Sequence, residues 1–600
     1  MSKDTKRVVN DIEFDSSLMK HVHHNVTCLL DLPDEIVLLI CRYLTPVCVL
    51  YSFYTPERAE FRLHRIISNY YTKIKIDRIT NNGFMYLANL FGYSKIPLRP
   101  QSLILSNEHV TYLIQRYFND MNTNTINSIF TNLRSLTLIN CFSIDLDILA
   151  KFYFNMTQIE YLHITFRRID DDMKFRVRER CDATINQFLF NRQMSSLQQV
   201  IIDVPDGLVL HKTLIPNQYL KNIDLVLETI DDLYVLLSGL VPNIEKITIQ
   251  LHRSRILSRL RPRSLSSYPR LTKFTLLEAG IGFISDDIKS ILGYMRNLLK
   301  LTLSIRDTPD PTFCHGPKFE SILIEYLPNL CQFDYTMTHR IGNETLFEDF
   351  IVWPMNYVVY EDEKCEWVHV YSLPWPSNKY DKRELPIVKN QCNTSVTSDV
   401  KQDEYIKDVM ITEPNELFEL KTRFRRAYQI RTCLSIDTKL TSRISKVILT
   451  KQTRKRILSN KMYEKKRSRL FVSGIASMNS MIQPFVHHLI VECRLNDERE
   501  IHLLARQFPH VEYLKLLFPF VESAFIRCFQ TLFSVDESIN ANHRIWHKLI
   551  NFSIEFSNNE LNLMLDDNDF HRWLTRNTDF KFVTSNFYLN YFNAILSIWF

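Results

Sequence analysis

A short line with apolar side chains at its first, fourth and sixth positions recurs along this 600-residue chain. Leu133, Leu136 and Leu138 form one copy. Further copies begin at Ile159, Leu197, Leu220, Ile244, Leu271, Leu298 and Leu330, and late in the chain at Val486, Val511 and Leu549. Neighbouring copies begin mostly 23 to 27 residues apart. Self-similarity at this period indicates stacked structural units, each of which buries its apolar face against its neighbours.

Each copy alternates apolar and polar residues at its end, which predicts a short strand with one face in the core. The residues between copies read as helices, for example 231–240 and 286–294, and each closes before a turn such as Val241-Pro242-Asn243. Strand, turn, helix and turn in repetition predict an α/β solenoid, with parallel strands on its concave side and helices on its convex side. A plain α/β domain is the alternative, and it predicts less regular spacing.

The line from Leu133 to Cys141 resembles a leucine-rich repeat, and the resemblance extends from about Leu98 to Phe556. In that family an asparagine or cysteine is buried after the second strand leucine. Here that place holds Cys141 once and elsewhere Arg167, His252 or Arg306. The resemblance therefore implies a solenoid with irregular curvature, whose turns are satisfied by other groups.

A second constraint lies near the beginning, in the run from Leu32 to Phe53. Pro33 and the acidic residues around it favour a helix start, and the residues that follow are apolar on nearly every side of a helix. Such a helix must be covered on more than one side. The next predicted helices, 47–53 and a set at helical spacing from Ala59 to Tyr70, can cover one side. Another side is left for a partner.

This run resembles an F-box, a helical module through which a substrate receptor docks on the Skp-type adaptor of a cullin-RING ubiquitin ligase. The resemblance implies a set of adaptor-binding residues: Leu32, Pro33, Glu35, Ile36, Ile40, Tyr43, Leu44 and Leu50. The tryptophan common in the third helix of F-boxes is absent between Thr55 and Tyr71. The alternative is that the run is only a helical cap on the next domain.

These features divide the chain into five segments. We expect a flexible tail at 1–28, an F-box-like module at 29–75, a repeat solenoid at 76–390, a basic and disordered insertion at 391–480, and C-terminal repeats with a cap at 481–600. Within 351–376, tryptophans and tyrosines cluster with acidic residues. This cluster is either a partner-binding hot spot or a seal over a distorted repeat.

The basic insertion concentrates the positive charge of the chain. From Lys421 to Arg469 there are seventeen basic residues against two acidic ones, a local charge of +15, while the whole chain carries +6. The remainder therefore carries −9. Such blocks are typically solvated, and an import signal or phosphate contacts are the functional options. Base-stacking aromatics are sparse there, which argues against a protein that reads single strands, and a nucleic-acid partner is not expected.

Signatures of catalysis are missing. The chain has only 10 glycines, too few to suggest phosphate-binding loops, and it contains no zinc-protease, nucleophile-elbow or P-loop motif. Its 12 cysteines are scattered, and we find neither a secretion signal nor a membrane span, so a cytoplasmic or nuclear location is expected. The sequence thus favours a non-enzymatic substrate receptor of a ubiquitin ligase, without a cofactor. A ligase-independent repeat scaffold is the alternative.

Overall fold

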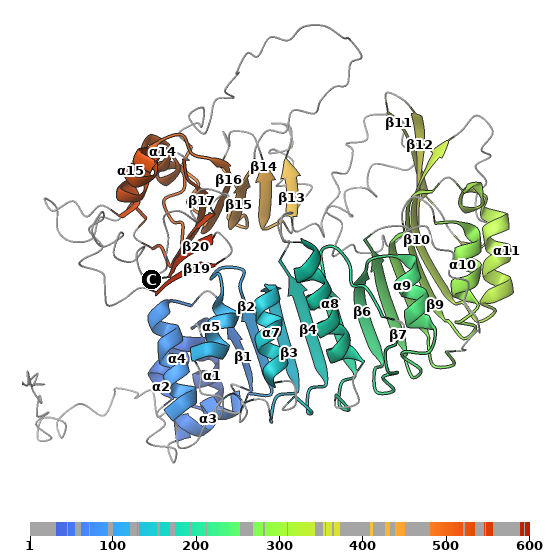
Figure 1. The fold of residues 1–600 in the computed structure, drawn as a ribbon, viewed down its shortest axis with the longest axis horizontal. Coiled ribbons are helices and arrows are strands. Elements are labelled where there is room, and N and C mark those ends of the chain that lie inside the picture. Colours follow the sequence, from blue (N-terminus) through green and yellow to red (C-terminus); the bar gives the residue numbers. More distant parts are fainter. Residues whose placement is uncertain are drawn as a thin grey trace, which may run out of the picture.

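The computed structural model describes residues 32–372 and 408–599 apart from internal gaps, the longest of which are 253–267, 412–426, 451–480 and 556–587. The predicted tail at 1–28 lies outside the described residues. The described residues form two sheets flanked by helices (Figure 1).

The first sheet is built from strands that follow one another in the chain. Ten are parallel and adjacent in sequence order: β1 Lys73–Ile76, β2 Ser102–Ser106, β3 Ser135–Cys141, β4 Tyr161–Phe166, β5 Gln199–Asp203, β6 Asn222–Leu227, β7 Lys246–Leu251, β8 Lys273–Ala279, β9 Lys300–Thr308 and β10 Gln332–Ile341. This confirms the predicted α/β class and parallel sheet. The arrangement is compatible with an α/β solenoid.

Helices lie between successive strands and run along one side of this sheet (Figure 1). They are α4 Asn81–Tyr93, α5 Leu113–Asp120, α7 Ser143–Phe152, α8 Lys174–Leu189, α9 Ile230–Leu237, α10 Ser285–Leu292, the 3₁₀ turn η5 Pro311–Cys314, and α11 Gly316–Tyr326. The predicted helices 231–240 and 286–294 are α9 and α10, each displaced by one to three residues at its ends.

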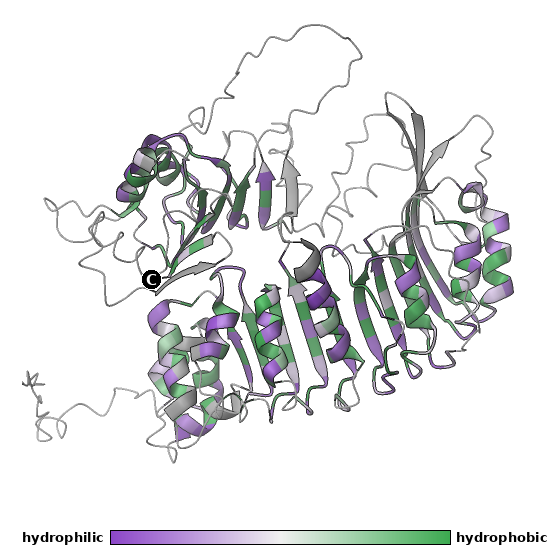
Figure 2. Ribbon diagram, viewed as in Figure 1, coloured by the Kyte–Doolittle hydropathy of each residue, from purple (hydrophilic) through white to green (hydrophobic). Residues whose placement is uncertain are grey.

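Alternation along the strands separates the two faces of the sheet. In β7, Ile247, Ile249 and Leu251 are buried, while Lys246 is exposed and points to the opposite face. Figure 2 shows hydrophobic and hydrophilic residues alternating along these strands. Because the buried residues belong to one core shared with the helices, we call the opposite face the helix-free face.

The aromatic stretch 351–376 ends the first sheet with two antiparallel strands. Strand β12 Cys365–Tyr371 pairs with β10, and β11 Asn356–Asp362 pairs with β12. Trp353 packs edge-on against Phe333, with ring centroids 6.0 Å apart, and lies against the core. For Trp353 this favours the role of a seal. The other rings of the stretch lie outside the described side chains.

The second sheet corrects the prediction for residues 391–480. Three parallel strands lie inside that segment: β13 Asp408–Ile411, β14 Gln429–Thr432 and β15 Lys446–Leu449. The prediction of a disordered insertion is therefore wrong for these strands. Ile430 and Val447 are fully buried, so short apolar runs within the basic block form strands despite the surrounding charge. Residues 451–480 lie outside the described part of the chain.

The second sheet continues with β16 His488–Arg494, β17 Tyr513–Leu517 and β18 Asn551–Glu555, and ends in the antiparallel strands β20 Ile595–Trp599 and β19 Tyr588–Phe592. Helices α14 Glu498–Gln507 and α15 Glu522–Phe533 accompany it. The lines beginning at Val486, Val511 and Leu549 thus form parallel strands, as predicted.

The two sheets meet near the beginning of the first one (Figure 1). Trp599 donates from its indole Nε1 to the carbonyl of Ile79 at 2.8 Å, and its ring lies 5.2 Å from that of Phe84 and under the guanidinium of Arg116. His109 contacts the ring of Tyr513 at 4.7 Å. The repeats before and after the basic segment therefore belong to two sheets that touch.

Candidate docking surface

The F-box-like run folds as three short helices. They are α1 Asp34–Tyr43, α2 Pro46–Phe53 and α3 Arg62–Tyr70. Pro33 is the N-cap residue of α1, and its carbonyl accepts from the backbone N–H groups of Ile36 and Val37 at 3.1 Å. The predicted helix start at about Pro33 is thus confirmed.

Helix α3 holds the start of α1 in place. Arg62 donates from Nε to the carboxylate of Asp34 at 2.7 Å, and from Nη2 to the carbonyl of Leu32 at 2.7 Å. Asp34 therefore pairs with Arg62 across the module. This exposed contact joins the start of α1 to the start of α3.

The inner side of α1 is a narrow stripe. Val37 and Cys41, one helical turn apart, are almost fully buried against the neighbouring helices, and burial raises the pKa of the Cys41 thiol. Leu50 on α2 and Ile67 on α3 complete this small core. The same core continues into the repeats, since all four residues belong to the cluster that includes the strand residues of the first sheet.

The outer side of α1 is apolar, and its side chains are exposed or half-buried among the residues that the structure describes. Ile36, Leu39, Ile40 and Tyr43 follow the spacing that places side chains on one helical face. Ile36 and Leu39 are exposed, Ile40 is half-buried, and Tyr43 is 84% exposed. Leu44 at the end of the helix is exposed as well. We call these five residues the α1 outer surface.

A second aromatic side chain stands on α2. Tyr51 is 73% exposed and meets the ring of Tyr86 edge-on, with centroids 5.1 Å apart. The hydroxyl of Tyr86 donates to the carbonyl of Leu50 at 3.1 Å, which ties α4 to α2. Tyr51 thus adds an exposed, oriented ring to the apolar side chains of the module.

The remaining predicted docking residues differ in their exposure to solvent. Pro33 and Glu35 are exposed at the start of α1, and Leu32 is half-buried beside the core. Leu50 is fully buried, because α2 packs against α3 and α4. Its side chain belongs to the interior and offers a partner no surface. Leu39 and Tyr51 were not among the predicted residues, although the helical period that selects Ile36 and Tyr43 also selects Leu39.

The boundary of the module is also earlier than predicted. Strand β1 begins at Lys73 and pairs in register with β2, so residues 73–75 belong to the sheet. The three helices end at Tyr70. The module is therefore joined to the first sheet through a single linking turn and a shared core.

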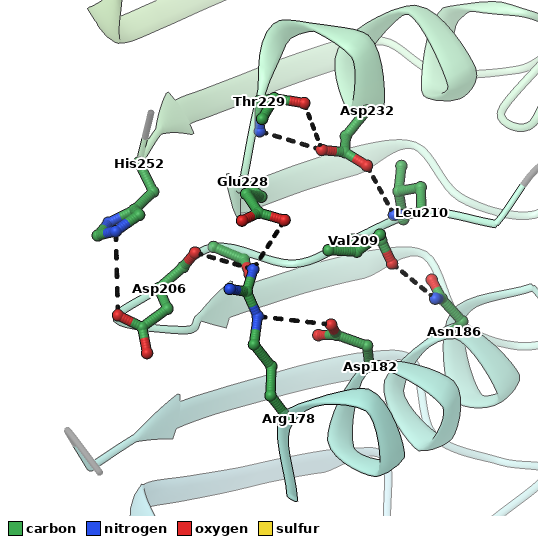
Figure 3. Close-up of polar contacts among 11 residues, drawn as sticks. Arg178, Asp182, Asn186, Asp206, Val209, Leu210, Glu228, Thr229, Asp232 and His252 are labelled. Carbon is green, nitrogen blue, oxygen red and sulfur yellow. Dashed lines mark hydrogen bonds and ion pairs between the residues drawn. The ribbon is translucent and has the colours of Figure 1, made fainter. Parts of the chain in front are cut away.

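A buried polar cluster beside β5 and β6 is the other candidate for a functional site (Figure 3). Arg178 of α8 reaches Glu228 at 2.9 Å and donates to the carbonyls of Asp206 and Gly207 at 3.2 Å. Its Nε lies 3.8 Å from Asp182. Burial raises the pKa of Asp182 to about 7, although Arg178 lowers it.

The rest of this cluster fixes backbone groups. Asp232 accepts from the backbone N–H groups of Leu210 at 2.9 Å and Thr229 at 3.0 Å, while the Thr229 hydroxyl donates to it at 2.8 Å (Figure 3). Gly207 has φ +76°, and a Cβ there would lie 2.5 Å from the backbone of Leu227. Burial raises the pKa of Asp232.

Two further helices use a carboxylate in the same way. Asp145 accepts from the N–H of Phe142, and Asp287 from that of Ile284, each three residues before the acid. These buried acids accept from the turns before the helices, where the sequence predicted that groups other than asparagine would satisfy the backbone. Burial at structural positions raises the pKa values of Asp145, Asp182 and Asp232, so we assign the Arg178 cluster a structural role.

No group of three or more His, Cys, Asp or Glu side chains in the described residues is placed to hold a metal ion. The described helices include none that is both long and apolar enough to cross a bilayer. No protein-family model matches the chain, and no curated protein sequence matches it. The α1 outer surface is therefore the best candidate that the geometry offers.

Proposed function

We propose that this chain is a non-catalytic substrate-recognition subunit of an SCF-type ubiquitin ligase. Its α1 outer surface, with Tyr51, binds a Skp-type adaptor, and its repeats bind a protein to be ubiquitinated. The observation that carries the proposal is the apolar stripe on α1, which stays exposed although the opposite stripe of the same helix is buried. The resemblance of Leu32 to Phe53 to an F-box supplies the identity of the partner.

Energetic considerations support a docking surface made of several side chains. Burying one Leu, Ile or aromatic side chain stabilises a complex by about 1.5–3 kcal/mol, whereas association costs about 4–15 kcal/mol. One exposed residue is therefore insufficient. The α1 outer surface and Tyr51 together offer six, with Pro33 and Glu35 at their rim.

The test is binding of the purified full-length chain to a purified Skp-type adaptor. Replacing Ile36→Asp together with Leu44→Asp puts two charges into the interface, so adaptor affinity should fall at least tenfold. A matched control replaces two exposed isoleucines away from α1, Ile215→Asp with Ile324→Asp. The control should bind as the unmodified chain does. Equal adaptor binding by all three proteins would contradict the proposal.

A second candidate function is that of a repeat scaffold whose helical module only caps the solenoid. The continuity of the core from Val37 into the first sheet favours this role for the inner side of α1. A pull-down of the full-length chain from native lysate separates the two. Recovery of adaptor together with cullin supports the ligase subunit, and recovery of other proteins without them supports the scaffold.

A further inference from the structure

Three lysines stand side by side on the helix-free face of the first sheet. Lys246, Lys273 and Lys300 are the first residues of β7, β8 and β9, and each is paired in register with the next. The residue after each of them is fully buried on the helix side. Adjacent strands lie about 4.8 Å apart, so the three side chains rise from a stretch about 10 Å wide. We call this set the lysine row.

The described residues neutralise the lysine row only in part. Lys300 lies 3.3 Å from a carboxylate oxygen of Asp334. Lys246 and Lys273 are exposed, and no ion pair within the described residues involves either of them. Like charges directly opposite one another on adjacent strands are unfavourable. A bound anion would relieve the repulsion between Lys246 and Lys273, because its negative charge would lie near both of their ammonium groups.

A row of hydroxyl groups runs parallel to the lysines. Thr248, Thr275 and Thr302 are paired in register with one another, two residues along each strand, and therefore share the same face. Thr248 and Thr275 are half-buried, and Thr302 is buried. Ammonium and hydroxyl donors thus converge on one small area, which suits carboxylate acceptors.

Acidic residues bound this area on both sides. Asp224 of β6 is the register partner of Thr248, and Asp334 of β10 is that of Thr302. A long polyanion laid across the sheet would meet these carboxylates, so a nucleic acid strand fits poorly. The positions of the two rows also carry no aromatic ring on which a base could stack.

We propose that the lysine row binds a short segment rich in aspartate and glutamate on a partner protein. In an extended segment, carboxylates two residues apart are separated by about 6.8 Å, so two of them reach neighbouring lysines and three cover the whole row. This inference rests on the proposed function, for which it names the chemical class of the target. Charge complementarity selects this occupant, since the surface is basic and narrow while the flanks are acidic.

The test uses the full-length chain and a fluorescein-labelled peptide of alternating glutamate and serine, with a glutamine-for-glutamate peptide as its neutral counterpart. Fluorescence anisotropy should show binding of the glutamate peptide alone, weakened by added salt. Lys246→Gln with Lys273→Gln should reduce affinity at least tenfold. A control with the same change in charge, Lys151→Gln with Lys318→Gln on exposed positions of α7 and α11, should leave it unchanged.

Three results would overturn the inference: failure of the unmodified chain to bind the glutamate peptide, an equal loss in the control variant, or tighter binding of a single-stranded oligonucleotide of equal charge. The lysine variant should still bind the Skp-type adaptor as the unmodified chain does. Loss of the acidic target and loss of adaptor docking are therefore separate outcomes. If the chain bound the peptide but not the adaptor, the proposal for the lysine row would stand and the proposed ligase function would be contradicted.

Discussion

Two surfaces in the N-terminal part of the molecule differ in whether the chain covers them. The surface between α4 and α5, at Phe84 and Arg116, is covered by Trp599 from the far end of the chain. There the ring is buried and its N–H reaches the carbonyl of Ile79. The α1 outer surface carries apolar side chains as well, yet Tyr43 and its neighbours are exposed.

The comparison shows what this chain does with an apolar surface that it uses internally. The ring of Trp599 is buried, and its indole N–H has a hydrogen-bond acceptor, as is usual for a buried tryptophan. The α1 outer surface lacks that cover within the described residues. A surface of this kind is typical of a site that another protein completes.

The largest effect should come from the covered surface. Trp599→Ala removes a buried ring and leaves the carbonyl of Ile79 without its donor, so the free energy of unfolding should fall by about 3–5 kcal/mol. Tyr43→Ala removes an exposed ring and should change it by less than about 0.5 kcal/mol. Urea unfolding followed by circular dichroism measures both. A comparable loss in Tyr43→Ala would mean that α1 is covered after all.

The two sides of α1 should separate stability from docking. Val37→Ala opens a cavity in the core and should cost about 2–3 kcal/mol of unfolding free energy. Leu39→Ala on the outer side should cost no more than about 1 kcal/mol but should weaken adaptor binding several-fold. Thermal unfolding and adaptor titration of both variants test this. An adaptor affinity unaffected by Leu39→Ala would place the interface elsewhere.

The same comparison applies to charged groups, since Asp182 is buried whereas the lysine row is largely exposed. Burial raises the pKa of Asp182 to about 7, whereas an aspartate in an unfolded chain titrates near 3.9. Between about pH 4 and pH 7 the folded chain therefore holds a proton that the unfolded chain has lost, so stability falls as pH rises.

Asp182→Asn removes this dependence and keeps an acceptor for the backbone. We compare the free energy of unfolding of the variant with that of the unmodified chain at each pH. From pH 4.5 to pH 8, this difference should change in favour of the variant by about 1–2 kcal/mol. Urea unfolding at the two pH values measures the difference. An identical difference between the two proteins at both pH values would contradict the raised pKa.

The smallest effect belongs to the uncovered charge of the lysine row. Lys273→Gln removes repulsion from Lys246 and Lys300 on the neighbouring strands, and it should stabilise the fold by about 0.2–0.5 kcal/mol at low salt. The gain should shrink in high salt, because salt screens exposed charges. Unfolding at two salt concentrations tests this. A loss of stability at both would give Lys273 a structural role.

Much of the fold follows from alternation along the sequence. The lines from Leu133 to Leu330 predicted strands β3 to β10, since apolar residues two apart can only meet the helices from one side of a strand. Strand β1, whose sequence Lys-Ile-Lys-Ile also alternates, was missed because the first position of its line holds Tyr71 in place of an aliphatic residue. Strands β13 and β15 were missed although the line is present there, at Ile406, Val409 and Ile411 and at Ile444, Val447 and Leu449, because it lies within a highly charged segment.

Features set by distant contacts could not be predicted in this way. The meeting of the two sheets depends on Trp599 and Ile79, which are far apart in the sequence. The helical period alone showed that α1 is apolar on nearly all sides. Which of its residues face outward depends on how α1 packs against α3, and the burial of Leu50 depends on α3 and α4. The lysine row emerges only when three strands are aligned.

Hydrogen exchange of the full-length chain, measured with and without a Skp-type adaptor, tests the central claim most directly. The account predicts that the adaptor protects backbone amides of α1 and α2 and leaves the strands that carry the lysine row unchanged. Protection of the sheet without protection of α1, or none in either region, would contradict docking through the α1 outer surface.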